Sequence, residues 1–337
     1  MAVTSYKCPG CGAGIEFKPD IHKFKCDYCL SQFTEEEIRK QSEENGARKF
    51  NSYNCKSCGA KVVTHETTTA TFCYYCHNPV IISDRLEGDF LPSKIIPFSI
   101  DKKKAEELFM KWAGRKHFVP NDFTSSSQLE KITGMYLPYW WVDCKADIDY
   151  VAEGRNIRTW RGGQTQYTET KQYEIIRQGK IDINNVSELA FTKIDRNLLN
   201  GIGPYNEKES IPFSMPYLSG FFAEQYDITR EEAKPFIDEQ VNRYYSYVVS
   251  ELVSGYDSVN SIKKDINIDL TKWNYTLLPA WILTYKYNNK TYVYAVNGQT
   301  GKSFGELPLS SSKLNKAFGL VFGITSSILL AGGMFIW

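Results

Sequence analysis

The amino-acid sequence predicts an α+β protein in three parts: two small cysteine-rich ribbons, a β-rich α+β domain and one C-terminal transmembrane helix. Three observations lead to this fold class. Eight cysteines form two identical spacings within the first 76 residues, a long middle region mixes strand-like patterns with two capped helices, and the last 21 residues carry no charge. Such patterns are typical of a globular domain joined to a membrane span.

The composition is that of an ordinary globular protein. Of 337 residues, 42% are hydrophobic and 23% are charged, and 40 Lys and Arg against 39 Asp and Glu leave a formal net charge of +1. This balance excludes intrinsic disorder, a collagen-like chain and a strongly basic nucleic-acid coat protein. The length is sufficient for two or more domains with cores of their own.

The predicted ribbons span residues 1–33 and 51–82, and each contains two CxxC pairs separated by fourteen residues. A CxxC turn of the rubredoxin-like knuckle type directs two thiolates to one point, and a hairpin brings the second pair to complete a tetrahedron. Four sulfur ligands favour zinc, with iron as the usual contaminant. We expect two structural zinc ions per chain, bound by Cys8, Cys11, Cys26 and Cys29, and by Cys55, Cys58, Cys73 and Cys76.

Other uses of these cysteines fit their surroundings less well. Disulfides are disfavoured in the reducing cytosol where the predicted topology places the ribbons, and a redox CxxC would need a βαβ context that is absent. Four cysteines per site leave no open position for a catalytic zinc. Between the ribbons, residues 34–50 are expected to form a helical linker that begins with a capping box from Thr34 to Glu37.

The ninth cysteine, Cys144, lies in a segment where apolar residues alternate with Asp143, Asp147 and Asp149. This alternation predicts a half-buried strand with Cys144 on its apolar face. We interpret Cys144 as a core thiol rather than a nucleophile, and the aspartates as a solvated face. A cation site on that face is the alternative.

Residues 83–312 are expected to form the β-rich domain, with two helices among its strands. The first helix is capped by Ser99 or Asp101, and the second begins with a capping box from Thr229 to Glu232. Apolar residues at helical spacing predict the buried face of each helix. These faces are Ala105, Leu108, Phe109 and Trp112 in the first, and Val241, Tyr244, Tyr245, Val248, Leu252 and Val253 in the second.

Two phrases recur within this domain and suggest an internal duplication over 95–157 and 210–306, with an inserted hairpin near 158–198. In each copy an IPFS phrase comes first, a helix follows, and an LPxW phrase then leads into strands. The phrases are IPFS at 96–99 and 211–214, LPYW at 137–140 and LPAW at 278–281.

No catalytic constellation is recognisable by spacing, so we expect a binding platform rather than an enzyme. The segment NGQTGKS at 297–303 resembles a phosphate loop, but only two residues separate its first glycine from the GK pair. A phosphate loop needs four residues there. The tight-turn chemistry of Asn-Gly predicts a hairpin turn instead.

The uncharged run over 317–337 predicts a transmembrane helix. At about 1.5 Å per residue it would be roughly 31 Å long, close to the hydrocarbon thickness of a bilayer. Lys313 and Lys316 precede it, so the positive-inside rule predicts a single-pass, tail-anchored protein of the cell membrane with its bulk in the cytosol. A buried C-terminal helix is the alternative. Small residues at every fourth position favour helix–helix packing, namely Gly319, Gly323, Ser327 and Ala331.

Several long segments, together with the two ribbons, resemble the bacterial TFIIB-type double zinc-ribbon membrane proteins, a family associated with the phage-shock protein PspA. The similarity extends over essentially the whole chain. It implies a role in the membrane-stress response beside PspA-type, SPFH-type and TPM-domain proteins, and it carries no catalytic residue. The segments are SKIIPFSIDKKKAEELFMKW, GMYLPYWWVD, PYLSGFFAEQYD and LLPAWILTYKYNNKTYVYAVNGQTGKSFGELP.

Taken together, these features predict a membrane-anchored zinc-ribbon adaptor or scaffold that recruits cytosolic protein partners to the lipid bilayer. The alternative is a replication-like protein whose ribbons bind nucleic acid. Residues 1–80 carry ten Lys and Arg against nine Asp and Glu. They therefore lack the basic excess that binding through phosphates requires, which favours protein contacts over nucleic acid.

Overall fold

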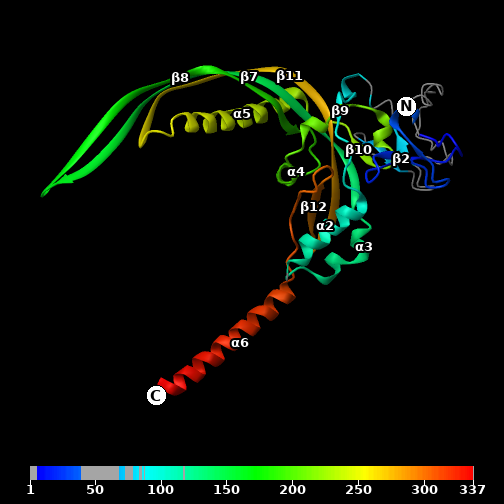
Figure 1. Ribbon diagram of the computed structural model, residues 1–337. Coiled ribbons are helices and arrows are strands. Elements are labelled where there is room, and N and C mark those ends of the chain that lie inside the picture. The colour runs from blue at the N-terminus through cyan, green and yellow to red at the C-terminus, as the bar shows by residue number, and fades with distance from the viewer. Residues whose placement is uncertain are drawn as a thin grey trace.

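In a computed structural model, the chain is a mixed α+β protein built around one large sheet (Figure 1). The predicted α+β class is therefore confirmed. The structure describes residues 6–38, 68–72, 79–82, 86, 88–116 and 118–336.

The N-terminal ribbon is a small three-stranded antiparallel sheet. Its strands β1 (Glu16–Lys18), β2 (Lys23–Lys25) and β3 (Gln32–Phe33) lie in the order β1-β2-β3. The capping box expected after the ribbon is present. The N–H of Glu37 donates to Thr34 Oγ1, and the Glu37 carboxylate accepts from the N–H of Thr34 at 2.7 Å.

A ten-stranded sheet forms the body of the protein. Its main path is β13-β12-β11-β7-β10-β4-β5, with β8 beside β7, and with β6 between β11 and β9. Most neighbours are antiparallel, whereas β10 runs parallel to β7 and β6 runs parallel to β11. The strands are β4 (Thr68–Phe72), β5 (Pro79–Ile81), β6 (Lys94–Ile95), β7 (Thr133–Gly162), β8 (Thr165–Leu189), β9 (Ile211–Pro212), β10 (Phe222–Glu224), β11 (Ser258–Tyr287), β12 (Lys290–Asn297) and β13 (Ser303–Gly305).

The second predicted ribbon lies largely outside the described residues, as does the linker beyond residue 38. Within the ribbon's range of 51–82, the structure describes β4 and β5. These strands pair with each other, and β4 also pairs with β10 of the body. This part of the predicted ribbon therefore forms one edge of the large sheet. The predicted ligands outside the described residues are Cys55, Cys58, Cys73 and Cys76.

Three strands, β7, β8 and β11, are long enough to leave the body and form a curved arch (Figure 1). They contain 30, 25 and 30 residues, whereas strands in globular proteins usually have about 3–10. Bulges near Val142, Ser261 and Leu270 interrupt their registers, and bulges bend a strand. The hairpin expected near 158–198 corresponds to the β7–β8 part of this arch.

Helix α5 (Arg230–Leu252) lies along the concave side of the arch (Figure 1). Its predicted capping box is present, with Thr229 and Glu232 exchanging both hydrogen bonds. The predicted buried stripe is partly wrong, because Tyr244 and Leu252 are exposed. The arch contacts a stripe of residues spaced strictly four apart, which turns those two side chains outward. The buried residues of α5 are Ala233, Ile237, Val241, Tyr245 and Val249.

The body is completed by short helices that cover the sheet near the ribbon and the C-terminus. Helix α2 begins at the predicted cap, since the Asp101 carboxylate accepts from the N–H of Lys104. The short α-helices are α2 (Lys102–Gly114), α3 (Ser126–Leu129) and α4 (Arg196–Ile202), and the longer α6 (Ser311–Ile336) follows at the C-terminus. The 3-10 turns are η2 (Gly88–Phe90), η3 (Asn121–Thr124), η4 (Glu207–Glu209) and η5 (Met215–Leu218).

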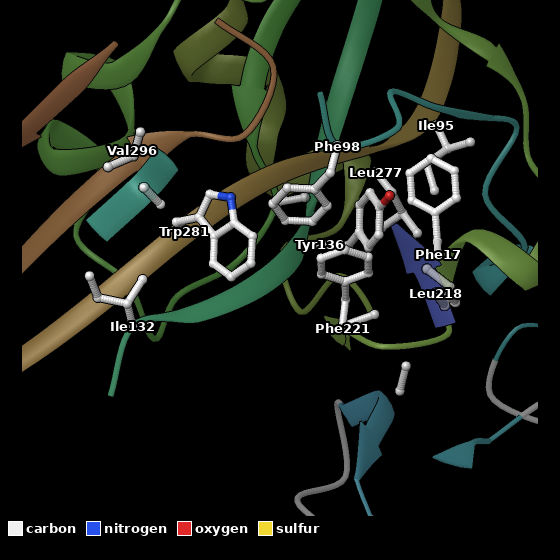
Figure 2. Packing of buried hydrophobic residues seen from close by; sticks show 14 of the residues in the cluster. Phe17, Ile95, Phe98, Ile132, Tyr136, Leu218, Phe221, Leu277, Trp281 and Val296 are labelled. Atoms are coloured by element: carbon white, nitrogen blue, oxygen red, sulfur yellow. The ribbon is translucent and has the colours of Figure 1, made fainter. Parts of the chain in front are cut away.

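The core of the body is rich in aromatic side chains. Figure 2 shows Phe98, Tyr136, Phe221 and Trp281 close together. The rings of Phe98 and Phe221 stack with centroids 4.2 Å apart, and the Trp281 indole N–H donates to the Ile100 carbonyl at 2.8 Å. This hydrogen bond satisfies the polar atom of a buried tryptophan, so the large apolar ring can be buried without an unpaired donor.

The two recurring phrases of the sequence lie side by side in the fold. Leu137 of β7 pairs with Leu278 of β11, and the flanking residues pair symmetrically around them. Ile211, the first residue of the second IPFS phrase, pairs with Ile95, the residue directly before the first IPFS phrase. Equivalent residues therefore meet across a local two-fold axis in the LPxW phrases, at Leu137 and Leu278. The internal duplication remains a prediction, and this pairing is the arrangement that it would produce.

Helix α6 leaves the body as a single helix and its described side chains are largely exposed (Figure 1). No helix in the described part of the chain is both long enough and apolar enough to cross a membrane. The predicted transmembrane helix over 317–337 and the cell-membrane location are therefore contradicted. Within the predicted run, α6 carries the polar side chains of Thr325, Ser326 and Ser327, and insertion of such groups into a bilayer is unfavourable.

Candidate metal centre

The first CxxC pair lies on a tight backbone knuckle at the start of the ribbon. The N–H of Cys8 donates to the carbonyl of Ala13 at 2.6 Å, and the N–H of Gly12 donates to the carbonyl of Cys8 at 2.9 Å. Gly12 has a φ of +75°, a conformation in which a residue with a Cβ is strained. The glycine therefore lets the chain reverse directly after the two cysteines.

The second CxxC pair repeats the same hydrogen bonds. The N–H of Cys26 donates to the carbonyl of Ser31 at 3.0 Å, and the N–H of Leu30 donates to the carbonyl of Cys26 at 2.8 Å. Leu30 occupies the position of Gly12, with a φ of +61°. Two knuckles with equal backbone geometry therefore face each other across the ribbon.

The four sulfur atoms of Cys8, Cys11, Cys26 and Cys29 all lie within 4.8 Å of one another. The Sγ atoms of Cys8 and Cys29 are 3.4 Å apart, and those of Cys11 and Cys26 are 3.6 Å apart. A disulfide would need about 2.05 Å. Four sulfurs at about 2.3 Å from one tetrahedral ion are roughly 3.8 Å apart. The observed spacing fits a single tetrahedral metal ion much better than two disulfides.

The chemical environment of the thiols also suits a cation. Hydrogen bonds from Ser31 lower the pKa of Cys29 to about 6. At Cys11, a backbone hydrogen bond with Ala13 favours ionisation, yet burial and the hydrogen bonds with the three neighbouring thiols together raise the pKa to about 12. Four thiols this close cannot all ionise unless a positive charge offsets their repulsion. A divalent metal supplies that charge.

The ribbon is packed against the body beneath the metal centre. The rings of Phe17 and Phe24 both contact Tyr217, with centroids 5.0 and 5.6 Å away. The N–H of Phe17 donates to the carbonyl of Ser219 at 3.1 Å, and the buried Ser219 hydroxyl donates to the carbonyl of Ile15. Residues that hold the two knuckles are therefore part of the same core as the body.

The structure assembles one of the two predicted metal sites. Cys8, Cys11, Cys26 and Cys29 meet as the sequence spacing predicts. The second set lies outside the described residues, so a second metal ion remains a prediction. Its ligands would be Cys55, Cys58, Cys73 and Cys76.

Cys144 is a core thiol, as predicted. It is buried, and its thiol donates to the carbonyl of Ile183 at 3.5 Å. Burial, with a smaller contribution from the charge of Asp143, raises the pKa of Cys144 to about 11. A thiol that ionises only at such a pH is a poor nucleophile under physiological conditions.

The aspartates beside Cys144 are occupied by contacts within the protein. Asp143 accepts from the N–H of Asn185 at 2.9 Å, and Asp147 lies 3.4 Å from the ammonium group of Lys180. The Asp149 carboxylate binds Lys263. These pairs are consistent with the predicted solvated face.

The segment from Asn297 to Ser303 is a turn between β12 and β13, as predicted. The Asn297 side-chain oxygen accepts from the N–H groups of Gln299 and Thr300 at 2.9 and 3.0 Å. Gly301 completes the turn with a φ of +77°. Backbone donors that would cradle a phosphate are thus used inside the turn.

Sequence reasoning missed an exposed aromatic surface on α5. Phe236, Tyr244 and Tyr247 are 38%, 49% and 62% exposed. The guanidinium of Arg196 lies 3.7 Å from the centre of the Phe236 ring. The only signal in the sequence was a helix with more apolar residues than one face can bury, and that signal does not say which of them face outward.

Comparison with known proteins finds a relative that matches nearly the whole chain. No protein-family model and no solved structure matches the chain. The uncharacterized protein YdjG of Bacillus subtilis (strain 168) is 34% identical to it over 342 residues. The alignment covers 98% of this chain and 99% of YdjG, so the similarity includes the ribbon, the arch and the C-terminal helix.

Proposed function

The chain belongs to the same family as Bacillus subtilis YdjG, and from this relationship we propose that the protein is a non-enzymatic adaptor that binds other proteins. A zinc-stabilised ribbon fixes one end of the body, and the arch supplies the surface for a partner. The observation that carries this proposal is the aromatic face of α5, defined here as Phe236, Tyr244 and Tyr247.

The metal centre supports a structural role for zinc. Four cysteine ligands fill a tetrahedral shell and leave no position for water or substrate. The centre is also joined to the body through Phe17 and Ser219. When bound, zinc would replace much of the hydrophobic core that so small a ribbon cannot build by itself.

The α5 face has the composition of a protein-binding surface. Tyrosine, phenylalanine and arginine are enriched where proteins meet, because they combine a large contact area with hydrogen bonding or charge. Here three aromatic side chains lie on a helix that the arch holds from the other side. A rigid support lowers the entropic cost of binding, because the contacting residues are already ordered.

The family resemblance names candidate partners for this surface. Proteins of the PspA, SPFH and TPM-domain types are the first to test. A nucleic-acid ligand is less consistent with α5, because this helix carries five Asp and Glu against three Lys and Arg. Carboxylates repel a phosphate backbone.

The adaptor function can be tested with exposed tyrosines in two places. After crosslinking and purification, we expect the double variant Tyr244→Ser/Tyr247→Ser to carry much less of the bound partner than the wild type does. Tyr28→Ser is the matched control, since Tyr28 is 83% exposed on the ribbon, away from α5. Equal recovery of each candidate partner by all three proteins would contradict the proposed role of α5.

The metal is tested separately by elemental analysis of the purified protein. Cys26→Ser should lower the zinc content by one equivalent, because three cysteines and one hydroxyl hold zinc much less tightly than four thiolates. Cys144→Ser, which changes a buried thiol outside the centre, should leave the content unchanged. Iron in place of zinc in the wild type would contradict the assignment of the metal.

A further inference from the structure

The outer end of the arch has two strands, whereas the rest of it has three. β11 begins at Ser258, which pairs with Arg155 of β7. Beyond that point, the segment of β7 from residue 156 to 162 pairs only with β8, down to the pair Gly162 and Thr165. This segment therefore has one backbone edge that no strand of the described chain covers, and we call it the open edge.

The start of β11 is fixed by side chains, so the open edge has a defined beginning. The Asp257 carboxylate accepts from the N–H of Ile157 at 2.6 Å, and the N–H of Asp257 donates to the Asn156 side-chain oxygen at 3.1 Å. The N–H of Ile157 thus points away from β8. Because backbone direction alternates with a period of two, Thr159 and Arg161 also present N–H and C=O groups on that side.

The side chains around the open edge are of the kinds that bind protein. Trp160 and Tyr167 stack with ring centroids 5.7 Å apart and remain 44% and 48% exposed. The guanidinium of Arg158 lies 5.8 Å from the centre of the Trp160 ring. On the opposite face, Ile157 is 51% exposed. A strand added here would therefore find apolar contacts on both faces.

The charge of the open edge indicates which kind of strand can pair with it. From residue 156 to 162, β7 carries Arg158 and Arg161 and no acidic residue. Two arginines within so short an edge would repel the same segment of a second copy, and charges on edge strands protect against such self-pairing. An acidic strand, by contrast, would form favourable cross-strand pairs.

We propose that the open edge of β7 binds an extended acidic segment of a partner protein, which adds to the sheet as a strand in line with β11. Backbone hydrogen bonds to Thr159 and Arg161 would supply affinity, and the arginines would select acidic side chains. Alternating N–H and C=O groups match a peptide backbone, whereas nucleic acid has no such pattern.

A pair of proline variants tests this edge directly. Thr159 and Thr168 are cross-strand neighbours at the same level of the hairpin. Since the N–H of Thr159 faces away from β8, that of Thr168 faces away from β7 at the opposite edge. Proline at either position removes one outward N–H and no backbone hydrogen bond between the two strands. Both variants lose the same side-chain hydrogen bond, between the Thr159 and Thr168 hydroxyls. The two variants therefore differ in which edge they block.

The probe is a fluorescent heptapeptide of alternating glutamate and valine, titrated into the full chain and followed by anisotropy. We expect Thr159→Pro to weaken its binding about tenfold, because a backbone hydrogen bond is lost and the strand is displaced. Thr168→Pro should bind as the wild type does. Arg158→Glu/Arg161→Glu should lose the acidic peptide and gain its lysine counterpart. Circular dichroism confirms that each variant is folded.

Several results would overturn the proposal. They are equal effects of the two prolines, no saturable binding of the acidic peptide by the wild type, and preferential binding of a short DNA duplex. The proposal deepens the adaptor function by naming a second surface and its partner segment. Thr159→Pro leaves α5 unchanged, so a failure at the open edge is distinguishable from a failure of the α5 face.

Discussion

At the residue scale, the two knuckles of the metal centre show how one backbone geometry is made with different side chains. Gly12 and Leu30 both have positive φ values, of +75° and +61°. Glycine adopts this conformation without a steric penalty, whereas a residue with a Cβ does not. The Leu30 side chain is 64% exposed, so its packing offsets little of the steric strain. The second knuckle is thus the strained one.

Replacing Leu30 by glycine should relieve this strain. We expect Leu30→Gly to stabilise the metal-loaded ribbon by about 1 kcal/mol, the difference between glycine and other residues in the left-handed region. The measurement is the chelator concentration at which half of the metal is lost, which should rise. Leu30→Ala is the control, because alanine keeps the Cβ. An equal gain with alanine would show that the exposed leucine, rather than φ, is responsible.

The buried carboxylate of Glu188 is a second feature at this scale. Its side chain is 3% exposed and lies 2.7 Å from Arg196 Nε, and Gln240 donates to it at 2.6 Å. Burial raises the pKa of Glu188, while the charge of Arg196 lowers it in part. A raised pKa in the fold means that ionised Glu188 costs stability, and that this cost grows as the pH rises through the folded pKa.

Removing the charge partner should therefore destabilise the protein in a pH-dependent way. We expect Arg196→Met to cost about 2 kcal/mol at neutral pH, below the range for a fully buried pair because Arg196 is partly exposed. The cost should shrink as the pH falls through the pKa of Glu188, since a protonated carboxyl needs no cation. Urea unfolding at neutral and mildly acidic pH measures this. The double variant Glu188→Gln/Arg196→Met should lose the pH dependence, and its persistence would contradict the assignment to Glu188.

At the scale of elements, α5 shows how a neighbouring sheet selects the buried face of a helix. The buried residues are spaced four apart, from Ala233 to Val249. Tyr244 and Tyr245 are consecutive, yet they are 49% and 2% exposed. An α-helix turns by about 100° per residue, so adjacent residues cannot both face the arch. The arch decides which tyrosine belongs to the core.

These adjacent tyrosines make a direct test of the packing. Tyr245→Ala should lower the free energy of unfolding by about 3 kcal/mol, because it leaves a cavity between α5 and the arch. Tyr244→Ala should cost at most about 0.5 kcal/mol, as is usual for surface positions. Chemical denaturation of both variants gives the comparison. Similar losses for the two would mean that α5 is not seated on the arch through this stripe.

At the scale of the whole molecule, the ribbon and the body share contacts that join the metal centre to the sheet. Phe17 and Ser219 are linked by a backbone hydrogen bond, and Tyr217 packs on the ribbon aromatics. The Tyr217 hydroxyl also donates to the Glu35 carboxylate at 3.3 Å. Loss of the metal should therefore also loosen the residues of the body that contact the ribbon. The arch extends in another direction (Figure 1).

Metal removal should accordingly have a local effect that crosses from the ribbon to the body. With a chelator, backbone amides in the ribbon and around Ser219 should exchange hydrogen faster, because opening of the ribbon removes their partners. Amides of β7 between residues 139 and 155 should keep their protection and serve as the internal reference. Hydrogen exchange with mass spectrometry resolves these regions. Unchanged exchange at Ser219 would show that the ribbon contact does not depend on the metal.

Local features of this protein were predictable because they depend on residues close in sequence. The spacing of Cys8, Cys11, Cys26 and Cys29 specified one metal site, and the capping boxes at Thr34 and Thr229 specified where two helices begin. The turn after β12 followed from Asn-Gly chemistry. In each case, the interacting groups are a few residues apart or belong to a motif whose backbone geometry is known.

The transmembrane prediction was wrong. It rested on the absence of charge over 317–337, a run that also contains Thr325, Ser326 and Ser327. The described part of the chain contains no helix apolar enough to cross a membrane. An uncharged run is not by itself an apolar one.

By itself, the sequence determined the first metal centre, the helix starts, the core position of Cys144 and the mixed α+β class. Only the tertiary structure decided the arch, the outward face of α5, the docking of the ribbon and the open edge of β7. These features depend on pairings between distant residues, such as Arg155 with Ser258 and Phe17 with Ser219. A pattern of period two or 3.6 shows that a face will be buried, but the partner that buries it is chosen by the fold as a whole.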